Sequence, residues 1–234
     1  MSKRCFLSWM AHQDQEMQQL TNGINQNAQD KEKLTALVQT CLKSYQGYCE
    51  QRLVFAKTHP SSVLSPSWCT SFENTNLWIG GCRPTLFIQL TYTLCGIDIE
   101  SELYEFLRGV RKGNLGELTS EQLTLVNDLQ MRTIQEENKL SARMASMQEE
   151  MGGKTVVQMA NELDQHGGST SDVDRVFDSY DVSWVSVLEE ADDLRLNTLK
   201  ELVSILTPFQ AVEFLMAGKK LHLSIHEWCK RREH

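Results

Sequence analysis

Two capping boxes constrain the fold of this chain most, because each marks the start of a long helix. Thr207 and Gln210 flank Pro208, so the threonine hydroxyl can accept a backbone hydrogen bond while the glutamine side chain accepts another in return. Pro208 takes the first helical position, where its missing N–H has no consequence. Thr119 and Gln122 repeat the pattern in the middle of the chain. Both patterns predict helix N-termini.

Strand patterns are nearly absent from the rest of the sequence. No segment alternates apolar and polar residues over several positions, and no Asn-Gly or Asp-Gly turn joins two β-branched runs. Apolar residues recur instead at helical spacing, for example at Leu34, Leu37, Cys41 and Tyr45. The sequence therefore predicts an all-α fold, in which residues 4–234 form a single-domain bundle with several long helices.

The expected helices can be placed from this periodicity and from the breaks between its segments. They cover residues 4–22, 30–57, 67–78, 84–95, 101–110, 119–151, 154–165, 172–206 and 208 to near the C-terminus. The segment from His59 to Pro66 is expected to be a loop, because it breaks the helical pattern. Gly80 and Gly81 are expected to end the helix before them, as glycines do at helix C-termini.

The last helix carries two stripes of chemically different residues. The apolar stripe, which is expected to pack into the core, consists of Phe214, Gly218, Leu221, Ile225 and Trp228. His222, His226 and Cys229 form a second stripe about 100° around the helix. Two imidazoles four residues apart suit joint coordination of one divalent metal ion, and Cys229 would provide a third ligand. The alternative is a pair of structural histidines at the solvent edge, next to Trp228.

Composition excludes several classes of protein. The 234 residues carry a formal net charge of −8, which argues against a general nucleic-acid-binding surface, since such a surface needs clustered Lys and Arg. The seven cysteines include no C-x-x-C pair, so they suit neither a disulfide framework nor a zinc finger, and most are expected to be buried thiols. No signal peptide or membrane segment is visible. We therefore expect a protein of the cytoplasm, the nucleus or both.

The sequence contains no motif of a known catalytic site. Phosphate-binding loops, nucleophile elbows, zinc-protease helices and EF-hand loops are all missing, so we expect no enzyme. The corner from Gly80 to Pro84 permits close backbone approach and places Arg83 at a helix N-terminus. Either this corner binds an anion through free N–H groups, or Arg83 pairs with a carboxylate of another helix and locks the corner.

The same corner resembles a known family. Residues 76–85, Asn-Leu-Trp-Ile-Gly-Gly-Cys-Arg-Pro-Thr, resemble the W-x-G-G-x-R-P motif of the plant Delay-of-Germination domain. Germination-delay proteins share that domain with the C-terminal half of TGA-type bZIP transcription factors. The block from Gly218 to Trp228 looks like the germination-delay branch in particular. Residues 191–195 and 206–211, together with Phe6, Trp9, Gln13 and Leu20, extend the resemblance over nearly the whole chain.

The resemblance implies a helical, non-enzymatic regulatory protein that acts through protein–protein contacts. Its implied partners are type 2C protein phosphatases of clade A in abscisic-acid signalling, and the implied process is seed dormancy. The resemblance also implies haem binding through His222 and His226. Because both rings project from one face of a helix, only one of them can be the axial ligand, and the other has a supporting role.

Two further expectations concern partners. Phe6 and Trp9 are expected to anchor the first helix to the bundle, which would leave its polar side, including Gln13 and Gln15, for a partner protein. Kinship with TGA factors implies an alternative role as a transcription regulator, through sequence-specific DNA binding or through recruitment to DNA-bound bZIP partners. Because no basic region or leucine zipper precedes residue 4, direct contact with DNA is not expected.

Overall fold

Helices make up almost all of the part of the chain that the structure describes. The computed structural model describes residues 3–95, 118–151, 153, 157 and 170–233. Its helices are α1 (Lys3–Asn27), α2 (Lys31–Ala56), α3 (Pro60–Leu64), α4 (Ser71–Thr75), α5 (Thr85–Leu94), α7 (Ser120–Met151), α9 (Thr170–Ile205) and α10 (Pro208–Glu233). Within these ranges there is no strand, and the predicted all-α fold is confirmed. The helices expected at 101–110 and, apart from residue 157, at 154–165 lie outside the described residues.

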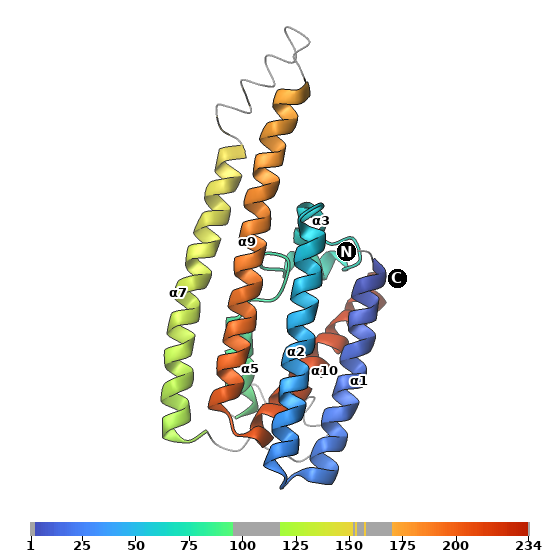
Figure 1. Cartoon of the computed structure of the whole chain (residues 1–234), viewed down its shortest axis with the longest axis vertical. Helices are drawn as coiled ribbons and strands as arrows, with labels where there is room; N and C mark the ends of the chain where they lie inside the picture. The colour runs from blue at the N-terminus through green and yellow to red at the C-terminus, as the bar shows by residue number, and fades with distance from the viewer. Residues whose placement is uncertain (1–2, 96–117, 152, 154–156, 158–169, 234) are drawn as a thin grey trace.

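The long helices stand side by side in one bundle (Figure 1). Helices α7 and α9 pack against each other as an antiparallel pair and extend beyond the other helices at one end. Helix α2 packs against α9 and α1, while α10 crosses behind α1 and α2 and contacts both. The short helix α5 fills the space between α7, α9 and α10. This arrangement brings both chain termini to the same side of the molecule.

The predicted capping boxes are both formed. The Thr207 backbone N–H donates to the Gln210 side chain at 2.9 Å, and the Gln210 N–H donates to the Thr207 hydroxyl at 3.3 Å. The corresponding distances between Thr119 and Gln122 are both 3.1 Å. A third capping box, which the periodicity did not reveal, starts α4 between Thr70 and Glu73. These bonds satisfy backbone donors that a helix N-terminus otherwise leaves unpaired.

The segment between α2 and α5 differs from the prediction. Residues 59–66 are not simply a loop, because Pro60 occupies an early helical position and starts α3. The helix expected over 67–78 is reduced to the five residues of α4. Gly80 and Gly81 do not end a helix but belong to a tight turn, in which Trp78 and Gly81 pair through both backbone groups.

The core of the described residues consists of three apolar clusters, the smallest of which is formed by Phe6 and Met10 of α1. The largest cluster joins α1, α2, α5, α7, α9 and α10 through side chains such as Leu20, Leu34, Ile88, Leu202 and Phe214. The second cluster lies against the turn after α4, and it contains Trp78, Ile79, Leu140, Leu188 and Ala191. Burying one such large side chain contributes about 1.5–3 kcal/mol to folding, so these clusters hold the helices in place.

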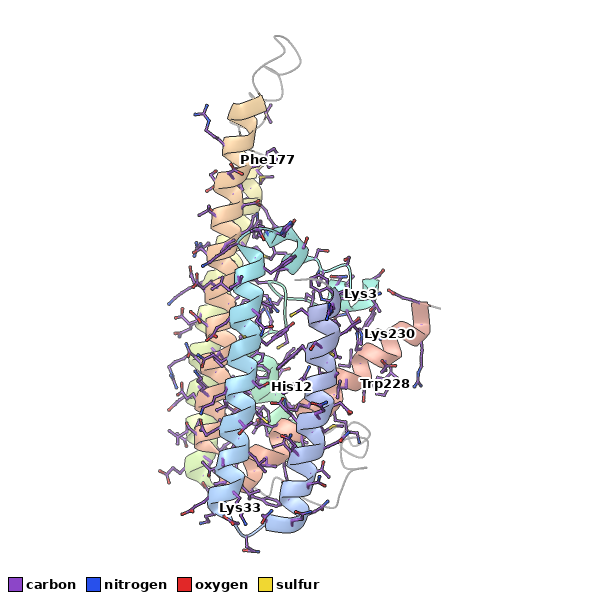
Figure 2. The ribbon with its side chains drawn as sticks, turned by 45° about the vertical axis from the view of Figure 1, so that its right-hand side comes forward. Lys3, His12, Lys33, Phe177, Trp228 and Lys230 are labelled. Carbon is purple, nitrogen blue, oxygen red and sulfur yellow. The ribbon has the colours of Figure 1, made fainter. Side chains whose placement is uncertain are left out.

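The outer parts of the molecule are solvated. Figure 2 shows Phe177 near the free end of α9, and Trp228 and Lys230 on the part of α10 that leans away from the α1–α2 pair. Phe177 and Trp228 are both roughly half exposed. Among the described helices, none combines the length and the apolar composition that crossing a bilayer requires.

Candidate functional site

A tight turn formed by residues 78–82 is the structural centre of the site. Ile79 and Gly80 have positive φ angles of 45° and 67°. The Trp78 N–H donates to the Gly81 carbonyl at 2.8 Å, and the Gly81 N–H donates back to the Trp78 carbonyl at 3.1 Å. Positive φ is costly for a residue with a side chain, so Ile79 keeps this conformation only because its surroundings hold it there.

Two buried arginines hold this turn from two long helices. Arg195 on α9, only 1% exposed, donates from Nε to the Cys82 carbonyl at 2.8 Å and from Nη2 to the Trp78 and Ile79 carbonyls. Arg52 on α2 donates from Nη1 to the Gly80 carbonyl at 3.0 Å. The turn carbonyls thus receive charge-assisted hydrogen bonds, which are about twice as strong as neutral ones.

One carboxylate lies between the two arginines. Asp192 Oδ1 is 2.6 Å from Arg195 Nη1, and its Oδ2 is 3.3 Å from Arg52 Nε. The three side chains therefore form a buried cluster with two positive charges and one negative charge. Burying unpaired charge is costly, so this cluster must be held in place by the surrounding fold or completed by a further anion.

The neighbouring corner is locked by a carboxylate from α7. Glu137, which is buried, accepts from the Thr85 backbone N–H at 2.8 Å and from the Thr85 hydroxyl at 3.2 Å. Its Oε2 also lies 3.9 Å from Arg83 Nε. Of the two alternatives for this corner, the ion pair between helices is therefore the one that the structure shows. Glu137 occupies the α5 N-terminus, where an external anion would otherwise bind.

A cavity of about 390 Å³ lies beside the turn, between α1, α2, α5 and α10. Its walls are largely aromatic and aliphatic, and they include Trp9, Tyr45, Tyr48, Leu86, Phe87 and Phe214. A few polar side chains also reach it, among them Gln13, Arg52, Lys219 and His222. A mainly apolar cavity of this size with a few polar groups is typical of a small-molecule binding site.

The two predicted histidines lie in different surroundings. His222 lines the cavity at an edge that is exposed to solvent, and its Nδ1 lies 2.9 Å from the Gln13 side-chain nitrogen. Desolvation by the surrounding protein lowers the pKa of His222, and the His226 and Lys219 charges add to this, so its ring is neutral at pH 7. His226 is 3% exposed, and its ring meets that of Phe6 edge-on at 5.3 Å.

His226 is oriented by a carboxylate. Its Nδ1 lies 2.7 Å from Glu73 Oε1, and because a carboxylate can only accept, Nδ1 carries the proton. Its Nε2 is buried, and no described residue forms a hydrogen bond with it. Desolvation raises the pKa of Glu73, but hydrogen bonds from Thr70 and His226 outweigh it, so that this pKa falls below its usual value. A histidine with one nitrogen bonded to a carboxylate and the other free is the usual arrangement of a metal-ligating imidazole.

The predicted orientation of α10 is wrong in its second half. Ile225 and Trp228 are 37% and 45% exposed, whereas His226 and Cys229 are buried. The histidine stripe packs against α1 and α4, which supply Phe6 and Glu73 as its partners. Periodicity alone could not show which of the two stripes of α10 faces the core, because they are only about 100° apart. The contacts of His226 with Phe6 and Glu73 show that the histidine stripe is the buried one in this half of the helix.

The structure does not complete a three-ligand metal site around the histidines. Among the described residues, no three His, Cys, Asp or Glu side chains converge in a way that could hold a metal ion. Cys229 is buried but does not complete a site with His222 and His226.

The predicted partner residues of α1 mostly face inward. Phe6 is buried, as expected of an anchor, and Trp9 stacks on Tyr48 with ring centroids 4.4 Å apart. Gln13 was expected on the polar side available to a partner, but it is buried and contacts His222. The helical pattern predicted that Gln13 faces solvent. Its amide instead has a partner inside the bundle, the ring of His222.

Sequence reasoning missed the buried charged residues. No sequence pattern assigned a buried role to Arg52, Arg195 or Glu137, yet each bonds to a segment at least 28 positions away in the chain. Lys219 was also missed: it is buried on α10 and pairs with Glu16 of α1 at 2.6 Å. The only hint in the sequence was the Gly80-Gly81 pair, because a turn without side chains can admit large side chains from elsewhere.

The fold and site together define an all-helical protein with an apolar cavity beside a turn that two arginines hold. A family profile described as seed dormancy control, DOG1, matches residues 16–93. The chain is 36% identical to protein DOG1-like 1 of Arabidopsis thaliana, over 98% of this chain and 89% of the relative. It is 34% identical to protein DOG1-like 3 of the same plant, over 100% and 85% of the two chains.

A weaker similarity links the chain to transcription factors. It is 25% identical to transcription factor TGA2 of Arabidopsis thaliana, over 95% of this chain and 59% of that protein. The chain belongs to the DOG1-like family, which confirms the resemblance found in the sequence. Membership of this family supports a regulatory protein related to seed dormancy.

Proposed function

We propose that this protein is a non-enzymatic regulator of seed dormancy that acts by binding other proteins. Its proposed partners are type 2C protein phosphatases in abscisic-acid signalling. The observation that carries the proposal is similarity to DOG1-like proteins over nearly the whole chain, at 36% and 34% identity. The proposed place of action is the nucleus, the cytoplasm or both, which fluorescence of a tagged chain in seed cells would test.

The buried charges support a role in binding rather than catalysis. Arg195 bonds to backbone carbonyls, Glu137 bonds to a helix N-terminus, and Lys219 pairs with Glu16. Each of these groups has a partner within the fold, so its charge serves to position helices. Chemistry on a substrate would instead need such groups to face a reacting atom.

The outward face of α1 is the surface that we propose for the phosphatase. Leu7, Ala11, Gln15 and Gln18 follow one another at helical spacing, and all four are exposed. Leu7 is an exposed large apolar side chain on this face, at 44%. Phe6 and Trp9, on the inner side, would act indirectly by fixing the orientation of α1.

Affinity purification from developing seed tests this function. The tagged chain should enrich type 2C phosphatases over bZIP transcription factors, and Leu7→Arg should reduce that enrichment. Leu125→Arg on α7 is the matched control, because Leu125 is also 44% exposed. Enrichment of bZIP factors without phosphatases would refute the proposal, as would equal recovery with the two variants.

We also propose haem as a ligand of the histidine pair. The fit rests on His226, whose Nδ1 donates to Glu73 while its buried Nε2 has no partner in the described part of the chain. His226 would hold the iron, and neutral His222 in the cavity wall would support the bound group. Bound haem would supply a redox-sensitive centre, and the surrounding side chains would determine access to it.

Titration with hemin distinguishes the roles of the two histidines. His226→Ala should abolish the sharpened Soret band, while His222→Ala should weaken it and Cys229→Ser should leave it unchanged. Circular dichroism must accompany each titration, because His226 is buried and its loss can destabilise the helix. If a divalent metal is the true ligand, both histidine variants should lose zinc equally and Cys229→Ser should add to the loss. An unchanged Soret band in the double histidine variant would refute haem ligation.

The similarity to TGA2 favours a second candidate function, regulation of transcription. We infer that this chain would act by recruitment to DNA-bound bZIP partners, because its net charge of −8 opposes direct contact with phosphates. A DNA-retention assay at increasing salt tests this. Sequence-specific, salt-dependent retention of the purified chain alone would instead show direct DNA binding.

A further inference from the structure

The cavity beside the turn is lined by a positive group, Arg52, one nitrogen of which has no acceptor among the described residues. Arg52 is 7% exposed and lines the cavity, and its Nη1 bonds to the Gly80 carbonyl. Its Nη2 is buried and has no hydrogen-bond partner among the residues that the structure describes. A buried guanidinium donor without an acceptor is costly, and a bound ligand would remove that cost.

The charges around Arg52 leave room for one more negative group. Arg52 and Arg195 share the single carboxylate of Asp192, so these three side chains sum to one positive charge. Glu73 also lines the cavity, but its oxygens bond to Thr70 and His226. A ligand with one carboxylate would make this cluster neutral.

The surfaces next to Arg52 are aromatic. Its guanidinium carbon lies 5.8 Å from the centre of the Tyr48 ring, and Tyr48 stacks on Trp9. Tyr48 and Trp9 both line the cavity, and Leu86 adds an aliphatic side chain that is 48% exposed although it belongs to the cavity wall. A flat apolar body of small size would cover these surfaces and remove them from water.

We propose that this cavity binds a small apolar carboxylic acid. The carboxylate of the ligand accepts from Arg52 Nη2, and its apolar body lies against Trp9, Tyr48 and Leu86. The contacts proposed here involve neither His222 nor His226, so this proposal does not depend on haem binding. Through contacts with α1, α2 and α5 at once, such a ligand would stabilise the relative positions of these helices.

Naphthoic acid and its neutral analogue naphthamide are suitable probes of this site in the purified full chain. Calorimetry should show the acid binding at least about 10-fold more tightly than the amide, because only the acid pairs with a buried charge. Arg52→Gln should remove this preference. Leu86→Trp should fill the cavity and weaken both compounds at least about 10-fold.

Leu125→Trp on α7 is the matched control, because Leu125 is similarly exposed but lies outside the cavity wall, and it should bind both probes like the wild type. Arg52 also donates to the Gly80 carbonyl, so Arg52→Gln can fail to fold. In that case the proposal is decided by the ratio of the two dissociation constants, acid against amide, in the wild type and by the weaker binding of both compounds to Leu86→Trp. Equal binding of acid and amide, no binding of either at about 1 mM, or unchanged binding to Leu86→Trp would overturn the proposal. None of these results decides whether haem binds, which the hemin titration of His226→Ala tests separately.

Discussion

Replacing Gly80 with alanine should destabilise the protein, because the turn leaves no room for a side chain. Gly80 has φ of +67°, and a methyl group there would lie 2.7 Å from the Val63 carbonyl oxygen. The left-handed conformation costs a residue with a side chain about 1–2 kcal/mol. The contact with a backbone oxygen forces α3 or the turn to move, which adds about 1–2 kcal/mol. We therefore expect a loss of about 2–4 kcal/mol in the free energy of unfolding.

Gly218→Ala is the matched control for this substitution. Gly218 lies within α10, where a methyl group would meet Leu90 at 3.6 Å, an ordinary contact distance. Alanine is favoured over glycine in a helix by about 1 kcal/mol, so this variant should be as stable as the wild type or more stable. The midpoint temperature of thermal unfolding should be about 4–16 °C lower for Gly80→Ala than for the wild type. If the two variants unfold at the same temperature, the account of the turn is wrong.

Four further substitutions test the surroundings of α10 and α1. Desolvation raises the pKa of Glu213 to about 7, so the folded protein favours the protonated carboxyl. The folded state therefore loses stability as pH rises from about 4.5 to 7 and this carboxyl ionises. Because Glu213 is only partly buried and solvent screens its charge, Glu213→Gln should stabilise the protein by about 1–2 kcal/mol at about pH 8 but not at about pH 4. Urea titrations that give equal effects at both pH values would refute this. His226→Ala should cost about 2–3 kcal/mol in the same titrations, because it removes a buried ring and the hydrogen bond to Glu73 Oε1, whereas His222→Ala at the cavity wall should cost less than about 1 kcal/mol. Equal losses would contradict the different surroundings of the two rings. Trp9→Ala should cost about 2–3 kcal/mol through its lost stacking, and a fully stable variant that loses only partner binding would instead assign Trp9 to an interface.

The helices could be predicted because their signals are local. Thr119 and Thr207 begin helices through bonds to residues three positions later, and the sequence shows such pairs directly. The helical periodicity likewise predicted the bundle. Prediction was least accurate between α2 and α5, where short helices depend on neighbouring elements more than on their own sequence.

The site could be predicted only in part, because its contacts join distant segments. The sequence drew attention to His222, His226 and the glycine pair, and all of these lie in or next to the site. It did not reveal that Arg52 and Arg195 hold the turn, since a buried arginine and an exposed one look alike in a helical pattern. Tertiary partners such as Glu73 also decided which stripe of α10 is buried.

Calorimetric titration of the purified chain with a clade-A type 2C phosphatase tests the central claim, regulation through protein contact, most directly. The account predicts a dissociation constant of about 1 µM or lower, which Leu7→Arg should raise at least about 10-fold and Leu125→Arg should leave nearly unchanged. The absence of binding by the wild type, or equal binding by both variants, would contradict it.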